Sequence, residues 1–301
     1  MEIYVRTRGW PRGNDYQFLG EAPEDFWWRS YGPVTDVERP TILLRSDGTS
    51  WQAYIAGIRS GRLDSTENAI QFNLVLAGDC GAEEENATAL SVITRSAAGL
   101  AEQGAQFIPG DPLDEQLPAD EVERMLTSPG KQTAAVAGAA VRAAYPPGGS
   151  VPPAAPGPAQ AGPDLTDAGP GLPDGDWIGG LAGPQALDAF AALVARLLDS
   201  GHAGRAAVLN LVADDGDLDG LPAWDGQLGA LGARPGPHLE MAVRTLGKDQ
   251  PLPDTETRRE PPGRLVTGRR AALILVGVAG AVVMAILIDW LVRMSSQHPH
   301  R

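Results

Sequence analysis

The sequence predicts an α+β domain with a mainly antiparallel sheet and several helices, followed by one C-terminal transmembrane helix. Three observations lead to this fold class. Short β-prone runs fill the first 80 residues, amphipathic helical spacing dominates the next region, and 18 consecutive uncharged residues occupy positions 271–288. Strands come first, helices follow, and strands return near residue 206. This order differs from the strict alternation of a parallel α/β fold.

Antiparallel strands are expected in the first 80 residues. Five β-prone runs lie between turn-forming residues, and the last of them alternates so that its large apolar side chains share one face. Asp47 and Gly48 separate two of these runs, and an Asp-Gly pair at such a point is typical of a β-hairpin. The expected strands span 2–7, 15–20, 41–45, 51–58 and 69–78.

Helices are expected next, because the apolar spacing changes from two residues to three or four. Leu90, Ile93, Ala97 and Leu100 recur at helical spacing, and Asn86 is the expected N-cap of their helix. The expected helices of this region span 86–103, 119–126 and 132–144.

A Pro- and Gly-rich segment, 145–175, interrupts the soluble part of the chain. It holds nine Pro and seven Gly, so it lacks the apolar surface that would offset the entropy cost of ordering it. We interpret it as a flexible linker or as a loop inserted within one domain. The regions 1–144 and 176–247 are therefore expected to form either two domains or a single one.

An amphipathic helix, 184–198, follows this segment, with its apolar residues on one side. Pro184 suits the first turn of the helix, and Gly201 follows as a stop signal. A polar, Pro-containing spacer, 248–270, ends the soluble region. The expected strands between helix and spacer span 206–212, 227–234 and 239–245.

The uncharged run is expected to cross a membrane as one helix over 271–292, followed by a short tail, 293–301. At about 1.5 Å per residue, its 18 residues cover roughly 27 Å, close to the ~30 Å hydrocarbon core of a bilayer. More Arg residues precede the run than follow it, which predicts a cytoplasmic N-terminal side. The first ten residues hold no apolar signal-peptide core. We therefore expect a single-pass, tail-anchored protein of a bacterial cell membrane.

Small residues recur every four positions within the expected span, at Gly277, Ala281 and Ala285. This spacing places them on one stripe of the helix, where two backbones can approach closely. The stripe is either a helix-pairing surface, which would make the chain a homo-oligomer, or the ordinary Gly and Ala content of a high-GC genome.

Charge and composition exclude several classes of function. The chain has 24 Lys and Arg against 38 Asp and Glu, a net charge of −14, so a general nucleic-acid binder is not expected. One Cys and four His leave too few ligands for a structural zinc site, and a single Cys forms no internal disulfide. The sequence contains no complete catalytic motif or phosphate-binding loop, so we predict no catalytic residue and no cofactor.

Two groups of residues are candidates for binding. Arg59, Arg62 and Asp64 lie in a polar segment between two expected strands. Paired arginines there can hold a carboxylate or phosphate, and the alternative is a solvated connection with a local ion pair. Trp27 and Trp28 belong to an aromatic, Arg-containing N-terminal region. Such a region is typical of a protein-docking surface or of the core of a small sheet.

Two further features are candidates for chemistry. Asp215, Asp217 and Asp219 match the first half of a calcium-binding loop, but its closing Glu is missing, so an ordinary acidic turn is the alternative. Cys80 follows an expected strand and is either a nucleophile, with a base such as His202, or a small, partly buried residue.

Three functions are compatible with this layout. The first is a membrane-tethered protein whose acidic cytoplasmic domain senses or binds a protein partner. The second is a membrane-acting effector of a bacterial conflict or defence system that oligomerises through its transmembrane helix. The third is a hydrolase that uses Cys80 or the acidic turn.

Overall fold

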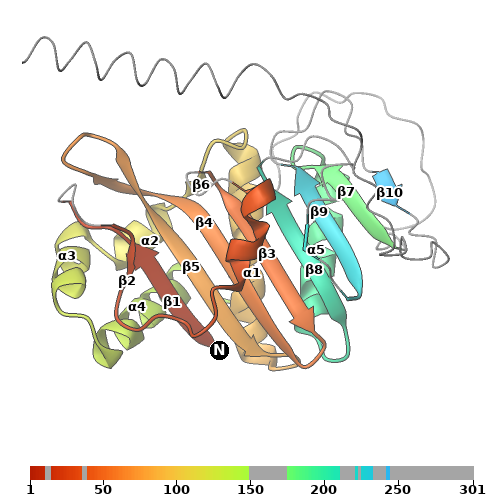
Figure 1. Cartoon of the computed structure of the whole chain (residues 1–301), viewed down its shortest axis with the longest axis horizontal. Helices are drawn as coiled ribbons and strands as arrows, with labels where there is room; N and C mark the ends of the chain where they lie inside the picture. The colour runs from red at the N-terminus through yellow and green to blue at the C-terminus, as the bar shows by residue number, and fades with distance from the viewer. Residues whose placement is uncertain are drawn as a thin grey trace, which may run out of the picture. The chain divides into compact units, whose positions relative to one another are not determined.

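The computed structural model describes residues 1–10, 15–35, 39–148, 175–210, 221–222, 225–232 and 242–244. These residues form an α+β fold around one mixed, mostly antiparallel sheet (Figure 1). The strands are β1 (Glu2–Thr7), β2 (Gln17–Phe18), β3 (Thr41–Asp47), β4 (Ser50–Leu63), β5 (Ala69–Asp79), β6 (Ile108–Pro109), β7 (Asp176–Gly180), β8 (Ala203–Leu209), β9 (Gln227–Gly232) and β10 (Ala242–Arg244). The predicted fold class is confirmed for these residues.

Within the described ranges, five α-helices and one 3-10 helix accompany the sheet. They are η1 (Trp27–Val34), α1 (Glu83–Glu102), α2 (Asp111–Gln116), α3 (Ala119–Thr127), α4 (Lys131–Ala144) and α5 (Pro184–Leu198). The described residues all belong to one compact unit, 1–247. In the described part of the chain, no helix is both long and apolar enough to cross a membrane. The predicted span, 271–292, falls outside that part.

The sheet is continuous across the Pro-rich segment. Its order is β10-β7-β9-β8-β3-β4-β5-β1-β2, and β6 pairs with β4 at the side. The link between the two halves is the antiparallel pair of β3 with β8, in which Ile42 lies opposite Val208 and Asp47 opposite Ala203. Residues on both sides of 145–175 therefore build one sheet.

Antiparallel pairing dominates the half built from β1, β3, β4 and β5. The predicted hairpin joins β3 to β4, and Asp47 fixes its turn by accepting hydrogen bonds from the backbone N of Thr49 (2.8 Å) and of Ser50 (2.7 Å). Gly48, at φ +88°, supplies the left-handed conformation that such a turn requires.

The other half contains parallel strands, which the sequence pattern does not reveal. Both β7 and β8 pair with β9 in parallel, and β9 lies between them. Consecutive strands that run parallel in one sheet need a long crossover connection, and α5 lies in the one that joins β7 to β8 across β9. This helix begins at Pro184 and ends at Leu198, as predicted.

Helices and sheet form two apolar layers of unequal size. On one face, α1 and α5 lie side by side behind the sheet (Figure 1), and α2, α3 and α4 extend the same core toward β1. On the other face, η1 lies in front of β3 and β4 and packs its aromatic side chains on the sheet. The central strands β3 and β4 are consequently buried on both sides along most of their length.

Two local predictions need correction, and four elements were missed. The predicted strand 15–20 shrinks to the two residues of β2. Asn86 is not the N-cap of α1, because the helix already begins at Glu83 and Asn86 is buried within it. The elements η1, α2, β6 and β7 were not predicted, because each is shorter than the window over which apolar spacing distinguishes a helix from a strand.

Candidate functional site

Two residues predicted for binding, Arg62 and Asp64, lie where β4 joins β5. Arg59 and Arg62 are on β4 itself, because this strand continues past its predicted end. Burial alternates along 58–63, so Arg59 lies on one side of the strand and Arg62 on the other. The two arginines have separate surroundings. The Arg59 guanidinium lies over the Phe107 ring, 4.9 Å from its centroid.

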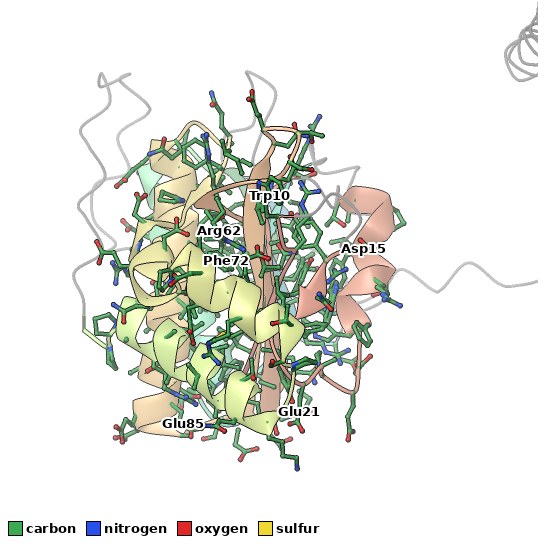
Figure 2. The ribbon with its side chains drawn as sticks, turned by 90° about the vertical axis from the view of Figure 1, so that its left-hand side faces the viewer. Trp10, Asp15, Glu21, Arg62, Phe72 and Glu85 are labelled. Carbon is green, nitrogen blue, oxygen red and sulfur yellow. The ribbon has the colours of Figure 1, made fainter. Side chains whose placement is uncertain are left out.

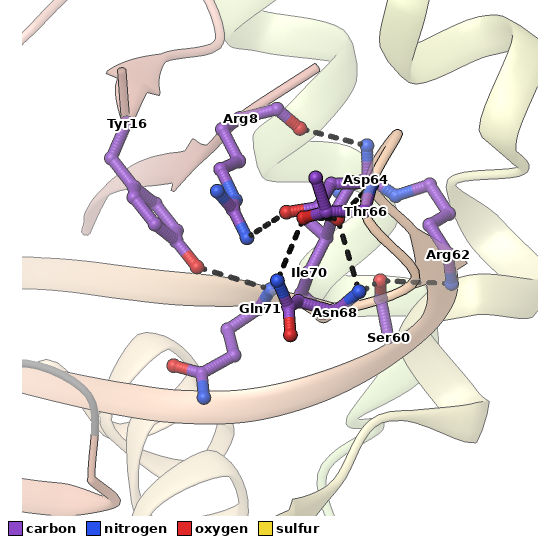
Figure 3. Close-up of polar contacts among 9 residues, drawn as sticks. All are labelled: Arg8, Tyr16, Ser60, Arg62, Asp64, Thr66, Asn68, Ile70 and Gln71. Carbon is purple, nitrogen blue, oxygen red and sulfur yellow. Dashed lines mark hydrogen bonds and ion pairs between the residues drawn. The ribbon is translucent and has the colours of Figure 1, made fainter. Parts of the chain in front are cut away.

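Asp64 fixes the loop between β4 and β5. Its Oδ1 accepts hydrogen bonds from the Thr66 backbone N (2.8 Å), the Thr66 hydroxyl (2.8 Å) and the Asn68 backbone N (3.0 Å). Its Oδ2 lies 2.8 Å from Nη2 of Arg8 (Figure 3). Hydrogen bonds led by that of the Thr66 hydroxyl lower the pKa of Asp64 to about 2. The carboxylate is therefore charged, and groups within the fold already hold it.

Arg62 is buried beneath this loop, with 8% of its surface exposed. Its Nη1 donates to the backbone O of Arg8 (3.2 Å) and lies 4.0 Å from Glu123 Oε1, and its Nη2 donates to the Thr7 hydroxyl (2.5 Å). The guanidinium also lies 4.8 Å from the Phe72 ring centroid, and Figure 2 shows the two side chains together. Burial lowers the pKa of Arg62, and the Glu123 carboxylate opposes that shift. Arg62 thus joins β4 to β1 and to α3.

The tip of the hairpin formed by β4 and β5, and the chain segment beside it, carry exposed apolar side chains. Trp10 is 60% exposed and Leu63 is 49% exposed. The backbone of Trp10 is held on both sides, since its N donates to Glu123 Oε1 (2.8 Å) and its O accepts from the Ser65 N (3.1 Å). Figure 2 shows Trp10 above Arg62. We call the following four residues the hairpin-tip surface: Trp10, Leu63, Glu67 and Glu123.

Two acidic helices, α2 and α3, border this surface. Asp114 of α2 accepts a hydrogen bond from the Gly61 N of β4 (2.6 Å), and Glu123 of α3 holds Trp10, so both helices are tied to the hairpin region. Burial raises the pKa of Asp114, against the opposing effect of the Gly61 hydrogen bond. The one basic residue in 111–127 is Arg124, which pairs with Glu121. The acidic ones are Asp111, Asp114, Glu115, Asp120, Glu121 and Glu123.

Trp27 and Trp28, the other residues predicted for binding, are each 7% exposed. The Trp28 ring stacks on Tyr54 with 4.7 Å between centroids, and the Arg45 guanidinium lies 4.7 Å from the Trp27 ring centroid. Both tryptophans belong to the core between η1 and the sheet, which is the second of the two interpretations of this aromatic region.

Cys80 lies at the end of β5, beside the start of β8. Its Sγ is 3.4 Å from the Ser46 hydroxyl oxygen and 3.7 Å from the backbone O of Leu197. Ser46 in turn donates to the backbone O of His202 (3.0 Å). These neighbours of the thiol are a hydroxyl and a carbonyl, and neither is a base that could take its proton.

A pocket of about 380 Å³ lies near Cys80, between the start of α1 and the end of α5. Asn86 lines it, but the side chain of Asn86 already joins three elements. Its Oδ1 accepts from Trp51 Nε1 (2.9 Å) and its Nδ2 donates to the Leu198 backbone O (2.6 Å). Asn86 therefore serves to join α1, α5 and β4.

The remaining predicted sites lie outside the described residues. These are the acidic turn with Asp215, Asp217 and Asp219, and the small-residue stripe of the expected span with Gly277, Ala281 and Ala285. Within the ranges that the structure describes, no cluster of three or more His, Cys, Asp or Glu residues could hold a metal ion.

Comparison with protein-family models, with curated proteins and with solved structures finds no match to this chain. Among the sites described above, the hairpin-tip surface combines exposed apolar groups with a fixed backbone. The sequence did not single out Leu63, Glu67 or Glu123. The one signal for this surface was Trp10, a tryptophan among polar neighbours, and its exposure depends on how the chain packs.

Proposed function

We propose that this chain is a single-pass membrane protein whose residues 1–247 form an acidic protein-interaction domain on the cytoplasmic side of the membrane. The observation that carries the proposal is the run of 18 uncharged residues at 271–288, which has the length and composition of a membrane span. Arginines that precede this run, among them Arg269 and Arg270, favour a cytoplasmic position for the domain.

The interaction role is supported by the hairpin-tip surface. Tryptophan often contributes a large part of the binding energy at protein interfaces. A tryptophan that is mostly exposed while its backbone is fixed by hydrogen bonds, as Trp10 is, therefore supports a role in binding. The polar residues beneath it, Arg62 and Asp64, are bonded to the fold and support the surface from inside. These features are typical of a binding surface built on a rigid scaffold.

Deletion of residues 268–301 tests the membrane tether. We expect the full chain to stay in the membrane fraction after alkaline carbonate extraction, and the shortened chain to be soluble with a cooperative thermal transition. Protease added outside spheroplasts is expected to leave residues 1–247 intact. A full chain that carbonate extracts, or a shortened chain that is insoluble or unfolded, would contradict the proposal.

A further inference from the structure

We infer that the hairpin-tip surface docks a protein segment that carries Lys or Arg next to a large apolar side chain. This inference rests on the proposed function, because it names the partner chemistry of the interaction domain.

The apolar part of the surface is Trp10 with Leu63. Among the large apolar residues of the described chain, the other exposed one is Val136, which is 42% exposed on α4. Trp10 and Leu63 both adjoin the loop after β4, since the Trp10 backbone bonds to Ser65, two residues beyond Leu63. Together they offer an aromatic and an aliphatic group to an apolar anchor of a partner.

The surface is fixed before any partner arrives. Trp10 is held at its N by Glu123 and at its O by Ser65, and the loop beneath is closed by the hydrogen bonds to Asp64. Asp64 is further held by Arg8. A surface that is already ordered loses little conformational entropy on binding, which favours affinity.

The charge of the surroundings selects a basic partner. Arg8 and Arg62 are paired inside the fold with Asp64 and Glu123, and Arg124 pairs with Glu121. Exposed acidic side chains in the neighbouring elements, namely Glu67 in the loop, Asp111 and Glu115 on α2, and Asp120 on α3, outnumber the exposed Arg59 of β4. An arrangement of this kind attracts Lys and Arg and repels acidic partners.

The same charges argue against a lipid surface as the occupant. The cytoplasmic leaflet of a bacterial membrane is anionic, so it repels a carboxylate-rich face and attracts a basic one. Residues 1–247 carry a larger excess of acid than the whole chain, because 248–301 hold Arg and Lys in surplus over Asp and Glu. A basic protein segment is the occupant that the observations favour.

The test uses the full chain in non-ionic detergent and a panel of fluorescent 15-residue peptides. The panel combines Lys or Arg with Leu or Phe at helical and at strand spacing, and a mirror panel replaces every Lys and Arg by Glu. We expect peptides of the basic panel to bind, with affinity that falls as salt rises, and the mirror panel not to bind. Trp10→Ala should weaken binding at least about tenfold, and Val136→Ala, the matched control, should leave it unchanged.

A charge variant, Glu67→Gln with Asp120→Asn, should weaken binding and reduce its salt dependence while Trp10 stays in place. Glu123 is left intact because it holds Trp10 and lies near Arg62. Circular dichroism melting of each variant checks that the fold is kept.

Several results would overturn the inference. These are equal binding of both panels, the absence of any basic peptide that binds, or binding that Trp10→Ala leaves unchanged. In nanodiscs, brominated lipids that quench the tryptophan fluorescence of the wild type more than that of Trp10→Phe would instead place Trp10 in the bilayer. Carbonate extraction tests the membrane tether separately, so failure of the tether and failure of the surface are distinguishable.

Discussion

At the scale of single residues, Trp10 and Trp28 have the same side chain and opposite surroundings. Trp28 stacks on Tyr54 within the core, and Trp10 is mostly exposed on a backbone that Glu123 and Ser65 hold. Composition shows only that tryptophans are concentrated near the N-terminus. The burial of each ring depends on how η1 and the β4–β5 hairpin pack, which is a tertiary property.

Asp64 should make the stability of the domain depend on pH. Its pKa in the folded protein is about 2, below the ordinary value of about 3.9 for an unfolded chain. The unfolded state therefore binds more protons between these values. The stabilisation is present in full above about pH 5 and is lost progressively as pH falls through about 2. We expect Asp64→Asn to be less stable than wild type at pH 6, by a difference that shrinks toward pH 2.

Urea denaturation at a series of pH values measures this difference. Ser65→Ala is the matched control, because it removes no hydrogen bond that Asp64 accepts and should keep the wild-type pH profile. A constant difference between Asp64→Asn and wild type from pH 6 to pH 2 would show that Asp64 does not act through its charge.

At the scale of elements, β4 depends on one glycine. The pairing of β4 with β5 shifts register between Ile55 and Ile58, and Gly57 lies at this irregularity with φ +80°. The Gly57 N donates to Asn73 Oδ1 (3.1 Å), and a Cβ at Gly57 would lie 2.6 Å from the Cα of Pro40. Neither the backbone conformation nor the space tolerates a side chain.

Gly57→Ala is therefore expected to lower the free energy of unfolding by at least about 1 kcal/mol, from left-handed backbone strain and the contact with Pro40. Chemical denaturation of wild type, Gly57→Ala and a control variant measures this change in the free energy of unfolding. Gly32→Ala is the control, since a Cβ there meets nothing within 4 Å. Equal stability of Gly57→Ala and wild type would mean that β4 can rearrange at this point.

Elements long enough to repeat their apolar spacing several times were predicted well, and shorter elements were not. The bounds of α5 agree with those expected from its apolar stripe and from Pro184, and β1 and β5 agree to within a residue. In contrast, η1 is a short 3-10 helix that contains Pro33, and α2 has six residues. Helices this short are marginally stable by themselves, and packing against the rest of the fold stabilises them.

At the scale of the whole molecule, the two sides of the Pro-rich segment depend on each other. β3 pairs with β8, and α1 packs against α5, whose Phe190, Leu193 and Val194 belong to the same core as α1. A chain that ends at residue 148 would leave β3 with an unpaired edge and expose this core.

We therefore expect residues 1–148 alone to show no cooperative unfolding and to aggregate. The chain without 268–301 is the control and should unfold in one transition. Thermal denaturation followed by circular dichroism, with light scattering, makes the comparison. A cooperative transition of residues 1–148 alone would show that this half folds independently.

The sequence by itself determined the α+β class, the main helices and the antiparallel strands of the first half, because local apolar periodicity records them. It also shows the uncharged run at 271–288 and the acidic balance of the chain. Only the tertiary structure decided that β3 joins β8, that β9 lies between two parallel strands, and that Arg62 and Asp64 point inward beneath an exposed Trp10. These facts depend on contacts between residues far apart in the chain, and periodicity within a short window carries no record of such contacts.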